Sequence, residues 1–242
     1  MICQLCGQKK KLIKAHIIPE GFFRPLRSGR KAPELHTNSK GVYPQRVPIG
    51  IYDKEILCAD CDGKFSLWEN HAHKVLIQNF TEDLAIYWNG QRICYNIIDF
   101  DYKLFKLFFL SLLWRASISN HIFYHRISVG PFEQKLKDMI LANDPGPPQT
   151  FAVTLAKFSD PNITVIMDPH LEKFSGINYC RFYLTGFVAY IKVDDRPVPD
   201  FMRDFYLRPD TPLPIILRDF HRSKDGALMK DIFQKSLLKM DI

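Results

Sequence analysis

The sequence contains no apolar run long enough to cross a lipid bilayer. Its most apolar stretch, residues 104–114, is interrupted by Lys106 and falls short of the roughly 20 residues that a membrane-spanning helix needs. The residues that follow Met1 turn polar and basic almost at once, which differs from the apolar core of a secretory signal peptide. We therefore expect a cytoplasmic protein that makes no contact with membranes.

The signatures of several large enzyme classes are also missing. The chain has no glycine-rich phosphate-binding loop and no strained nucleophile elbow of the α/β-hydrolase kind. It shows no internal repeat and no low-complexity segment. With 242 residues, of which 46% are hydrophobic, it can bury a core in one or two domains.

Four of the six cysteines form two Cys-x-x-Cys pairs, Cys3 with Cys6 and Cys58 with Cys61. Each turn brings two thiolates to one ion, and two such turns complete a closed tetrahedral zinc site. The alternative is a redox motif, which is expected once and near a βαβ pattern, and neither pair has that context. We predict structural Zn²⁺ in a reducing compartment. Because four thiolates leave no open position for a substrate, the chemistry has to come from other residues.

The net charge of +7 is concentrated near the N-terminus. Residues 1–60 contain eleven Lys and Arg against five Asp and Glu, a balance of +6, so the remaining residues carry only +1. A basic surface beside a metal module is typical of proteins that bind phosphates of nucleic acid, although an ordinary solvated surface is the alternative. The predicted contacts to nucleic acid are Lys14, Arg24, Arg27, Arg30 and Lys31.

Periodicity predicts short strands at 11–18 and 49–57 on either side of a long basic loop, followed by a helix over 62–80. A hairpin is predicted at Asn89-Gly90, because this dipeptide favours a type I′ turn between strands 84–88 and 92–98. These elements predict an α+β domain with a mostly antiparallel sheet. The further helices are expected at 102–119, 131–142 and 225–240, and the further strands at 151–157, 163–167, 179–183, 186–192, 201–208 and 213–218.

One stripe of the helix over 62–80 carries Asp62, Glu69 and His73. At 100° per residue, spacings of seven and four place these side chains within about 40° of one line. Two carboxylates and an imidazole could bind a divalent cation. An ordinary polar face exposed to solvent explains Glu69 and His73 equally well, whereas Asp62 stands out because it directly follows the second cysteine pair.

Taken together, the two cysteine pairs, the segment His16-Ile17-Ile18-Pro19 and Asp62 resemble the zinc-containing HNH endonucleases. The resemblance covers about residues 1–80 and implies a ββα-metal module over 1–82, followed by an α+β companion domain over 83–242. The later segment Leu110-Ser111-x-x-Trp114-Arg115-Ala116-Ser117 is similar to the companion region of bacterial HNH proteins.

The resemblance implies a catalytic role for His16 as the general base that activates water. In the family an acidic metal ligand precedes this histidine, whereas position 15 is alanine here. Asp53 stands where the family has its middle asparagine, and Asp62 stands where it has its last His or Asn. The implied reaction is hydrolysis of phosphodiester bonds with catalytic Mg²⁺ or Mn²⁺, and with DNA favoured over RNA as substrate.

Two alternatives remain open at this point. Ala15 favours a catalytically inactive zinc module that binds nucleic acid or a partner protein, with the C-terminal residues forming a surface for that partner or for a second copy of the chain. For His16 itself, the alternative is a purely structural histidine that stabilises its strands or donates to a backbone carbonyl.

Overall fold

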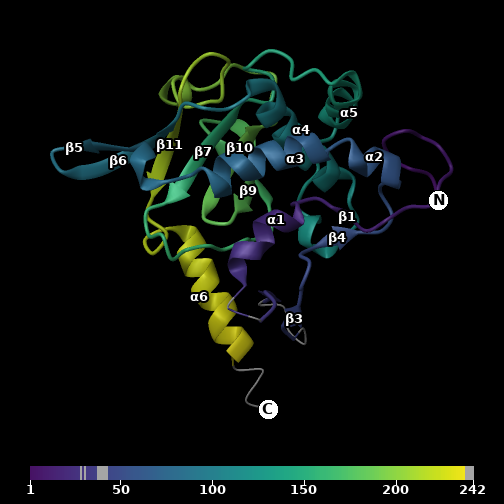
Figure 1. The fold of residues 1–242 in the computed structure, drawn as a ribbon, viewed down its shortest axis with the longest axis horizontal. Helices are drawn as coiled ribbons and strands as arrows, with labels where there is room; N and C mark the ends of the chain where they lie inside the picture. Colours follow the sequence, from purple (N-terminus) through teal and green to yellow (C-terminus); the bar gives the residue numbers. More distant parts are fainter. Residues whose placement is uncertain (28, 30, 37–42, 238–242) are drawn as a thin grey trace.

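The computed structural model describes residues 1–27, 29, 31–36 and 43–237. A seven-stranded sheet lies at its centre, in the order β5-β6-β11-β7-β10-β9-β8 (Figure 1). Every neighbouring pair is antiparallel except β11 and β7, so the predicted α+β architecture with a mostly antiparallel sheet is confirmed. The strands are β5 (Ala85–Trp88), β6 (Gln91–Ile97), β7 (Val153–Phe158), β8 (His170–Phe174), β9 (Ile177–Leu184), β10 (Phe187–Lys192) and β11 (Leu213–Arg218).

Helix α4 (Tyr102–Ile118) runs through the middle of the protein. It begins at Asp101, whose side chain accepts a hydrogen bond from the backbone N–H of Leu104 at 2.9 Å and so caps the first turn. Residues 105–116 are all buried, as expected for a helix that is apolar around its whole circumference. Helices α3 (Ser66–His73) and α5 (Phe132–Ala142) pack against it.

Both faces of the sheet are covered. Along β9, Cys180 and Phe182 face the core that contains α4, while Tyr179 and Tyr183 face a second apolar cluster. This alternation follows from the two-residue period of a strand. Helix α6 (Lys224–Leu237) covers the second cluster and contributes Leu228 to it.

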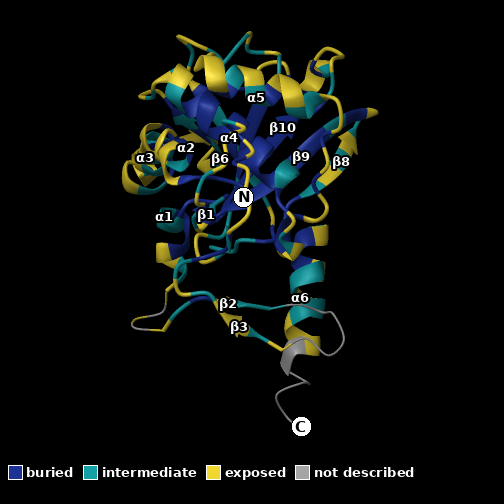
Figure 2. Ribbon diagram, turned by 90° about the vertical axis from the view of Figure 1, so that its right-hand side faces the viewer, coloured by how far each residue is buried: buried dark blue, intermediate teal, exposed yellow. Residues whose placement is uncertain are grey.

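The N-terminal segment wraps around one side of this core. Phe22 stacks on Phe108 of α4 with ring centroids 5.7 Å apart, and the Thr185 hydroxyl donates to the backbone oxygen of Phe22. Residues from both sides of position 82 belong to one continuous core, drawn dark blue in Figure 2. The segment contains β1 (Ala15–His16), α1 (Glu20–Phe23), β2 (Glu34–Leu35), β3 (Gln45–Arg46), β4 (Tyr52–Asp53), α2 (Ala59–Gly63) and α3.

The main departures from the predicted elements concern short segments. The helix expected over 62–80 is divided into α2, α3 and a π-helical turn (Lys74–Gln78). The strands expected at 11–18 and 49–57 pair with each other only at Ala15–His16 and Tyr52–Asp53, while Leu12 makes a single bridge to Cys58. The prediction of strands at 163–167 and 201–208 was wrong. Ile163 and Val165 pack on the second cluster without strand pairing, and Tyr206 makes a single bridge to Thr154. Their apolar pattern reflects burial and not pairing.

The other long elements agree with the sequence. The hairpin of β5 and β6 turns at Asn89 and Gly90, which have φ of 48° and 74°, as a type I′ turn requires. Within the described part of the chain, none of the helices combines the length and the apolar character needed to span a bilayer.

Candidate functional site

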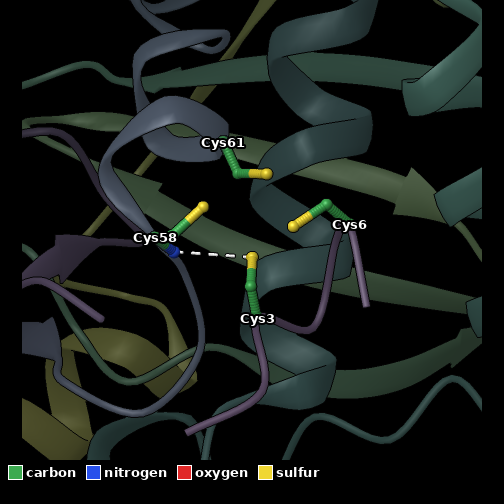
Figure 3. Close-up of side chains that lie close together, drawn as sticks. All are labelled: Cys3, Cys6, Cys58 and Cys61. Carbon is green, nitrogen blue, oxygen red and sulfur yellow. Dashed lines mark hydrogen bonds between the residues drawn. The ribbon is translucent and has the colours of Figure 1, made fainter. Parts of the chain in front are cut away.

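The four paired cysteines converge on one point, as Figure 3 shows. Cys3 and Cys6 come from the N-terminal turn, and Cys58 and Cys61 come from the start of α2. Their sulfur atoms all lie within 4.8 Å of one another. Thiolates around one zinc ion with Zn–S bonds of about 2.3 Å are roughly 3.8 Å apart, so the cluster fits this ion with a small contraction.

The four thiols differ in their electrostatic surroundings: burial, followed by hydrogen bonds with the other three cysteines, raises the pKa of Cys61. Burial raises the pKa of the Cys3 thiol, but backbone hydrogen bonds at Cys6, Cys58 and Leu5 outweigh burial and lower that pKa to about 6. One of these bonds is the N–H of Cys58 to Sγ of Cys3 at 3.4 Å. Donors of this kind stabilise the thiolate that a metal requires. The four cysteines could therefore hold a metal ion such as zinc.

His16 lies on a two-stranded ribbon next to this cluster. In the register of β1 and β4, Ala15 is opposite Asp53 and His16 is opposite Tyr52. Nε2 of His16 is 2.8 Å from the backbone oxygen of Ile49. A carbonyl oxygen only accepts, so Nε2 carries the proton and the neutral ring keeps Nδ1 as its acceptor.

The two faces of the ribbon differ in character. Side chains alternate along a strand, so Lys14, His16, Tyr52 and Lys54 share one face. The His16 and Tyr52 rings meet edge to face at 5.9 Å, and the ammonium groups of Lys14 and Lys54 lie 5.0 and 5.9 Å from the centre of the Tyr52 ring. This outer face is basic and aromatic.

The inner face of the ribbon is buried. Ala15 is fully buried, and the carboxylate of Asp53 accepts from the Ser119 hydroxyl at 2.6 Å and from the Glu55 N–H at 2.8 Å. Both oxygens of Asp53 are therefore already bonded to the protein. These contacts tie the ribbon to the end of α4 and place the Asp53 carboxylate on the opposite face from the His16 ring.

Asp62, which we expected near His16, lies within its electrostatic range. Burial raises the pKa of Asp62, Arg115 lowers it, Glu69 raises it and His16 lowers it. Asp62 is the first acidic residue after the last cysteine of the cluster and lies in the first turn of α2. Its carboxylate therefore interacts electrostatically with both the His16 imidazole and the Arg115 guanidinium.

The other two residues of the predicted cation site point elsewhere. Glu69 Oε1 lies 2.6 Å from Nη1 of Arg115, and this ion pair neutralises the charge of the Glu69 carboxylate. The ring of His73 packs on α1, so closely that a Cβ at Gly21 would lie 2.8 Å from its Cδ2 atom. Burial lowers the pKa of His73, and nearby Arg24 lowers it further. Among the described residues, the four cysteines are the only group of three or more His, Cys, Asp or Glu side chains close enough to share a metal.

The predicted basic contacts are mostly exposed. Arg24 and Arg27 lie 3.6 and 3.7 Å from the carboxylate of Glu20, and Arg27 also donates to the backbone oxygen of Pro48 at 2.7 Å. Lys31 is exposed, and Arg30 lies outside the described residues. Lys14 precedes β1 and shares the outer face of the ribbon with His16, whereas Arg24 and Arg27 share the carboxylate of Glu20.

Comparisons with other proteins were made on the whole chain. No protein-family model, no curated protein and no solved structure matches it. The function therefore has to be inferred from the side chains described here.

Sequence reasoning missed Arg115, the residue that connects the parts of the site. Its guanidinium is buried, donates from Nη1 to the backbone oxygen of His16 at 2.5 Å, and lies 4.6 Å from the centre of the Phe65 ring. The signal was present, because an arginine in the last turn of a largely apolar helix is seldom buried without a partner. The identity of that partner could not be read from the sequence, since 99 residues separate Arg115 from His16.

Proposed function

We propose that the protein is a metal-dependent endonuclease that hydrolyses phosphodiester bonds in nucleic acid, with His16 as the general base and zinc as a structural ion in the four-cysteine cluster. The observation that carries this proposal is the hydrogen bond between Nε2 of His16 and the backbone oxygen of Ile49. That bond fixes the ring and the tautomer, and it leaves Nδ1 on the accessible face of the ribbon to accept a proton from water.

The bond to Ile49 is also the structural role that we considered for His16. The two roles are compatible, because a general base needs one nitrogen held by the protein and the other free to accept. Within the described part of the chain, no hydrogen bond to Nδ1 of His16 occurs. The water oxygen would form the new bond to phosphorus while the bond to the leaving oxygen breaks, and His16 would take the proton that the water loses.

Asp62 is the proposed ligand of a second ion on the same side of the ribbon. Mg²⁺ in phosphoryl-transfer sites keeps several waters and binds through one or two carboxylates together with substrate phosphates, so the half-buried carboxylate of Asp62 would be a sufficient protein contribution. Such an ion would supply charge stabilisation at the scissile phosphate. Arg115 lies beneath the site and holds both the His16 backbone and Glu69 in place.

The outer face of the ribbon would hold the nucleic-acid backbone. The antiparallel register places Lys14 opposite Lys54, one step along the ribbon from the His16 and Tyr52 pair, so two cations would lie on one side of the position where a phosphate would meet the imidazole. Contacts of this kind position the substrate without reading its sequence. We propose DNA as the preferred substrate, and the experiment below compares it with RNA.

The decisive experiment is cleavage of plasmid DNA and of a long RNA in Mg²⁺ or Mn²⁺ by the wild type and by His16→Ala. If His16 is the general base, the variant should lose roughly 10²–10⁴-fold in rate while keeping its zinc and its fold. His221→Ala is the matched control, because this exposed histidine pairs with Asp160 at 3.1 Å far along the chain, and it should cleave like the wild type. If the wild-type protein binds nucleic acid but cleaves neither DNA nor RNA in any divalent metal, the proposed nuclease function is refuted.

The second candidate function is a zinc module that binds nucleic acid without cutting it. Ala15 favours it, because the acidic ligand that HNH enzymes carry before their histidine is absent and the fully buried position leaves no space for one. In this case the basic face of Lys14 and Lys54 would still bind the nucleic-acid backbone, and His16→Ala would leave the affinity nearly unchanged.

A further inference from the structure

One cavity of the protein shares no residue with the His16 face. It has a volume of about 630 Å³, within the range of roughly 300–1,000 Å³ that small-molecule sites occupy. It opens between α5, the loop over 147–151, the residues after β10 and the segment over 206–211. Aromatic rings of Phe132, Phe151 and Tyr206 form its apolar walls, together with three prolines.

The loop at the floor of the cavity has unusual support. Nζ of Lys106, fully buried in α4, donates to the backbone oxygens of Thr150 and Phe151 at 2.9 and 2.6 Å. The Thr150 carbonyl points at Lys106, so the N–H of Phe151, on the opposite side of the same planar peptide, points away from it. Phe151 itself has a φ of 48°, a left-handed conformation that a side chain other than glycine seldom adopts and that often marks a binding site.

The charged groups around the cavity leave a surplus of positive charge. Three cations line it, Lys135, Lys192 and Arg208, against the carboxylates of Asp194 and Asp195. Both acids are already paired: Asp195 lies 3.3 Å from Lys135, and Asp194 lies 2.6 Å from Arg196, outside the lining.

Two of these three cations, Lys192 and Arg208, have no carboxylate as a close partner among the described residues. Lys192 is buried, donates to the backbone oxygen of Arg196, and forms no ion pair within the described part of the chain. Arg208 lies over the Tyr206 ring at 5.4 Å and reaches only a distant carboxylate, that of Asp204, at 3.8 Å. The Arg208 side chain is 34% exposed, so its guanidinium is open to an anion that enters the cavity.

We propose that this cavity binds a nucleotide, with the phosphate against Arg208 and the planar base against the half-buried ring of Phe132. A guanidinium offers a fork of donors that matches phosphate oxygens, and aromatic rings stack on every base. Inorganic phosphate alone would leave most of the 630 Å³ and its apolar walls unfilled. The nucleotide is either a free molecule or the phosphorylated end of a nucleic-acid chain.

Calorimetric titration of the full chain with AMP, GMP, adenosine and inorganic phosphate tests the proposal. Both nucleotides should bind with a dissociation constant below about 1 mM, and adenosine and phosphate should each bind at least about tenfold more weakly. An oligonucleotide with a 5′-phosphate separates the sources: tighter binding than AMP indicates a chain end, and weaker binding indicates the free nucleotide.

Arg208→Gln should weaken AMP binding by about tenfold or more, because a charge-assisted contact is lost. Arg203→Gln is the matched control, since this exposed arginine pairs with Asp200 in the same segment and does not line the cavity; it should bind AMP like the wild type. If Arg208→Gln fails to fold, the same titration is made with Lys135→Gln, which removes another cation of the cavity from an exposed side chain and should also weaken AMP binding. No binding of either nucleotide, or equal affinity in Arg208→Gln and Arg203→Gln, overturns the proposal.

Discussion

Replacing Arg115 by methionine tests whether the centre of the candidate site is held together as described. The substitution keeps most of the apolar stem and removes the guanidinium, which has several contacts at once. These are the ion pair to Glu69 at 2.6 Å, the hydrogen bond to the His16 carbonyl at 2.5 Å and two bonds to Ser111 at 3.2 and 3.3 Å.

The expected cost follows from burial. Arg115 is 1% exposed and Glu69 21%, so Arg115→Met leaves a partly buried carboxylate without its cation. Breaking a buried ion pair from one side typically costs about 3–5 kcal/mol, and the residual exposure of Glu69 places the expected loss near the lower end. For a chain of 242 residues, about 3 kcal/mol corresponds to a fall of roughly 6–12 °C in the melting temperature.

Urea denaturation of four proteins measures this coupling: the wild type, Arg115→Met, Glu69→Gln and the double variant. Since Glu69→Gln removes the stranded charge, Arg115→Met should cost about 1–3 kcal/mol less in that background. Arg126→Met is the matched control, because Arg126 is 54% exposed and pairs with Asp168 at 3.3 Å, and surface pairs of this kind contribute about 0–1 kcal/mol. If Arg115→Met costs no more than Arg126→Met, Arg115 does not organise the site.

Three further predictions concern the zinc, the basic face and the buried lysine. Cys61→Ser should abolish stoichiometric zinc in elemental analysis and lower the melting temperature, because a structural zinc site is part of the folding free energy; full zinc content in the variant contradicts the cluster. Replacing Lys14 and Lys54 by glutamine should flatten the salt dependence of nucleic-acid binding by up to about 1.8 logarithmic units, if both contact phosphates, while Lys173→Gln, on the exposed side of β8, should leave the slope unchanged. Burial lowers the pKa of Lys106 from 10.5 to about 7, so above pH 7 the unfolded chain binds the extra proton and the stability of the wild type rises with pH. The unfolding free energy of the wild type minus that of Lys106→Met should therefore rise from about pH 7 to pH 9, and a constant difference would contradict the burial.

Much of the fold could be predicted because its signals are local. The hairpin at Asn89-Gly90 depends on two residues that accept positive φ, and the cysteine pairs depend on a spacing that brings two thiols to one point. Helix α4 also agrees with its predicted range, since a long apolar run can only be satisfied in a core. In each of these cases the physical cause lies within a few residues of its effect.

The connections between distant segments could not be predicted in this way. Which partner a buried Arg115 meets depends on how α4 crosses the ribbon, and that crossing is set by the packing of the whole core. For the same reason Glu69 was expected to bind a cation and instead pairs with a guanidinium, although the stripe geometry on the helix was sound. A polar stripe shows which side chains share a face and not what lies opposite them.

The alanine at position 15 has a structural explanation that the sequence conceals. Antiparallel pairing places Ala15 directly opposite Asp53, on the inner face, where the carboxylate is bonded to Ser119. An acidic residue at position 15 would place a second carboxylate beside the first in a fully buried space, and two such charges repel strongly in a low dielectric. We infer that a carboxylate serving His16 has to come from outside the ribbon, and Asp62 of α2 lies within electrostatic range of the imidazole.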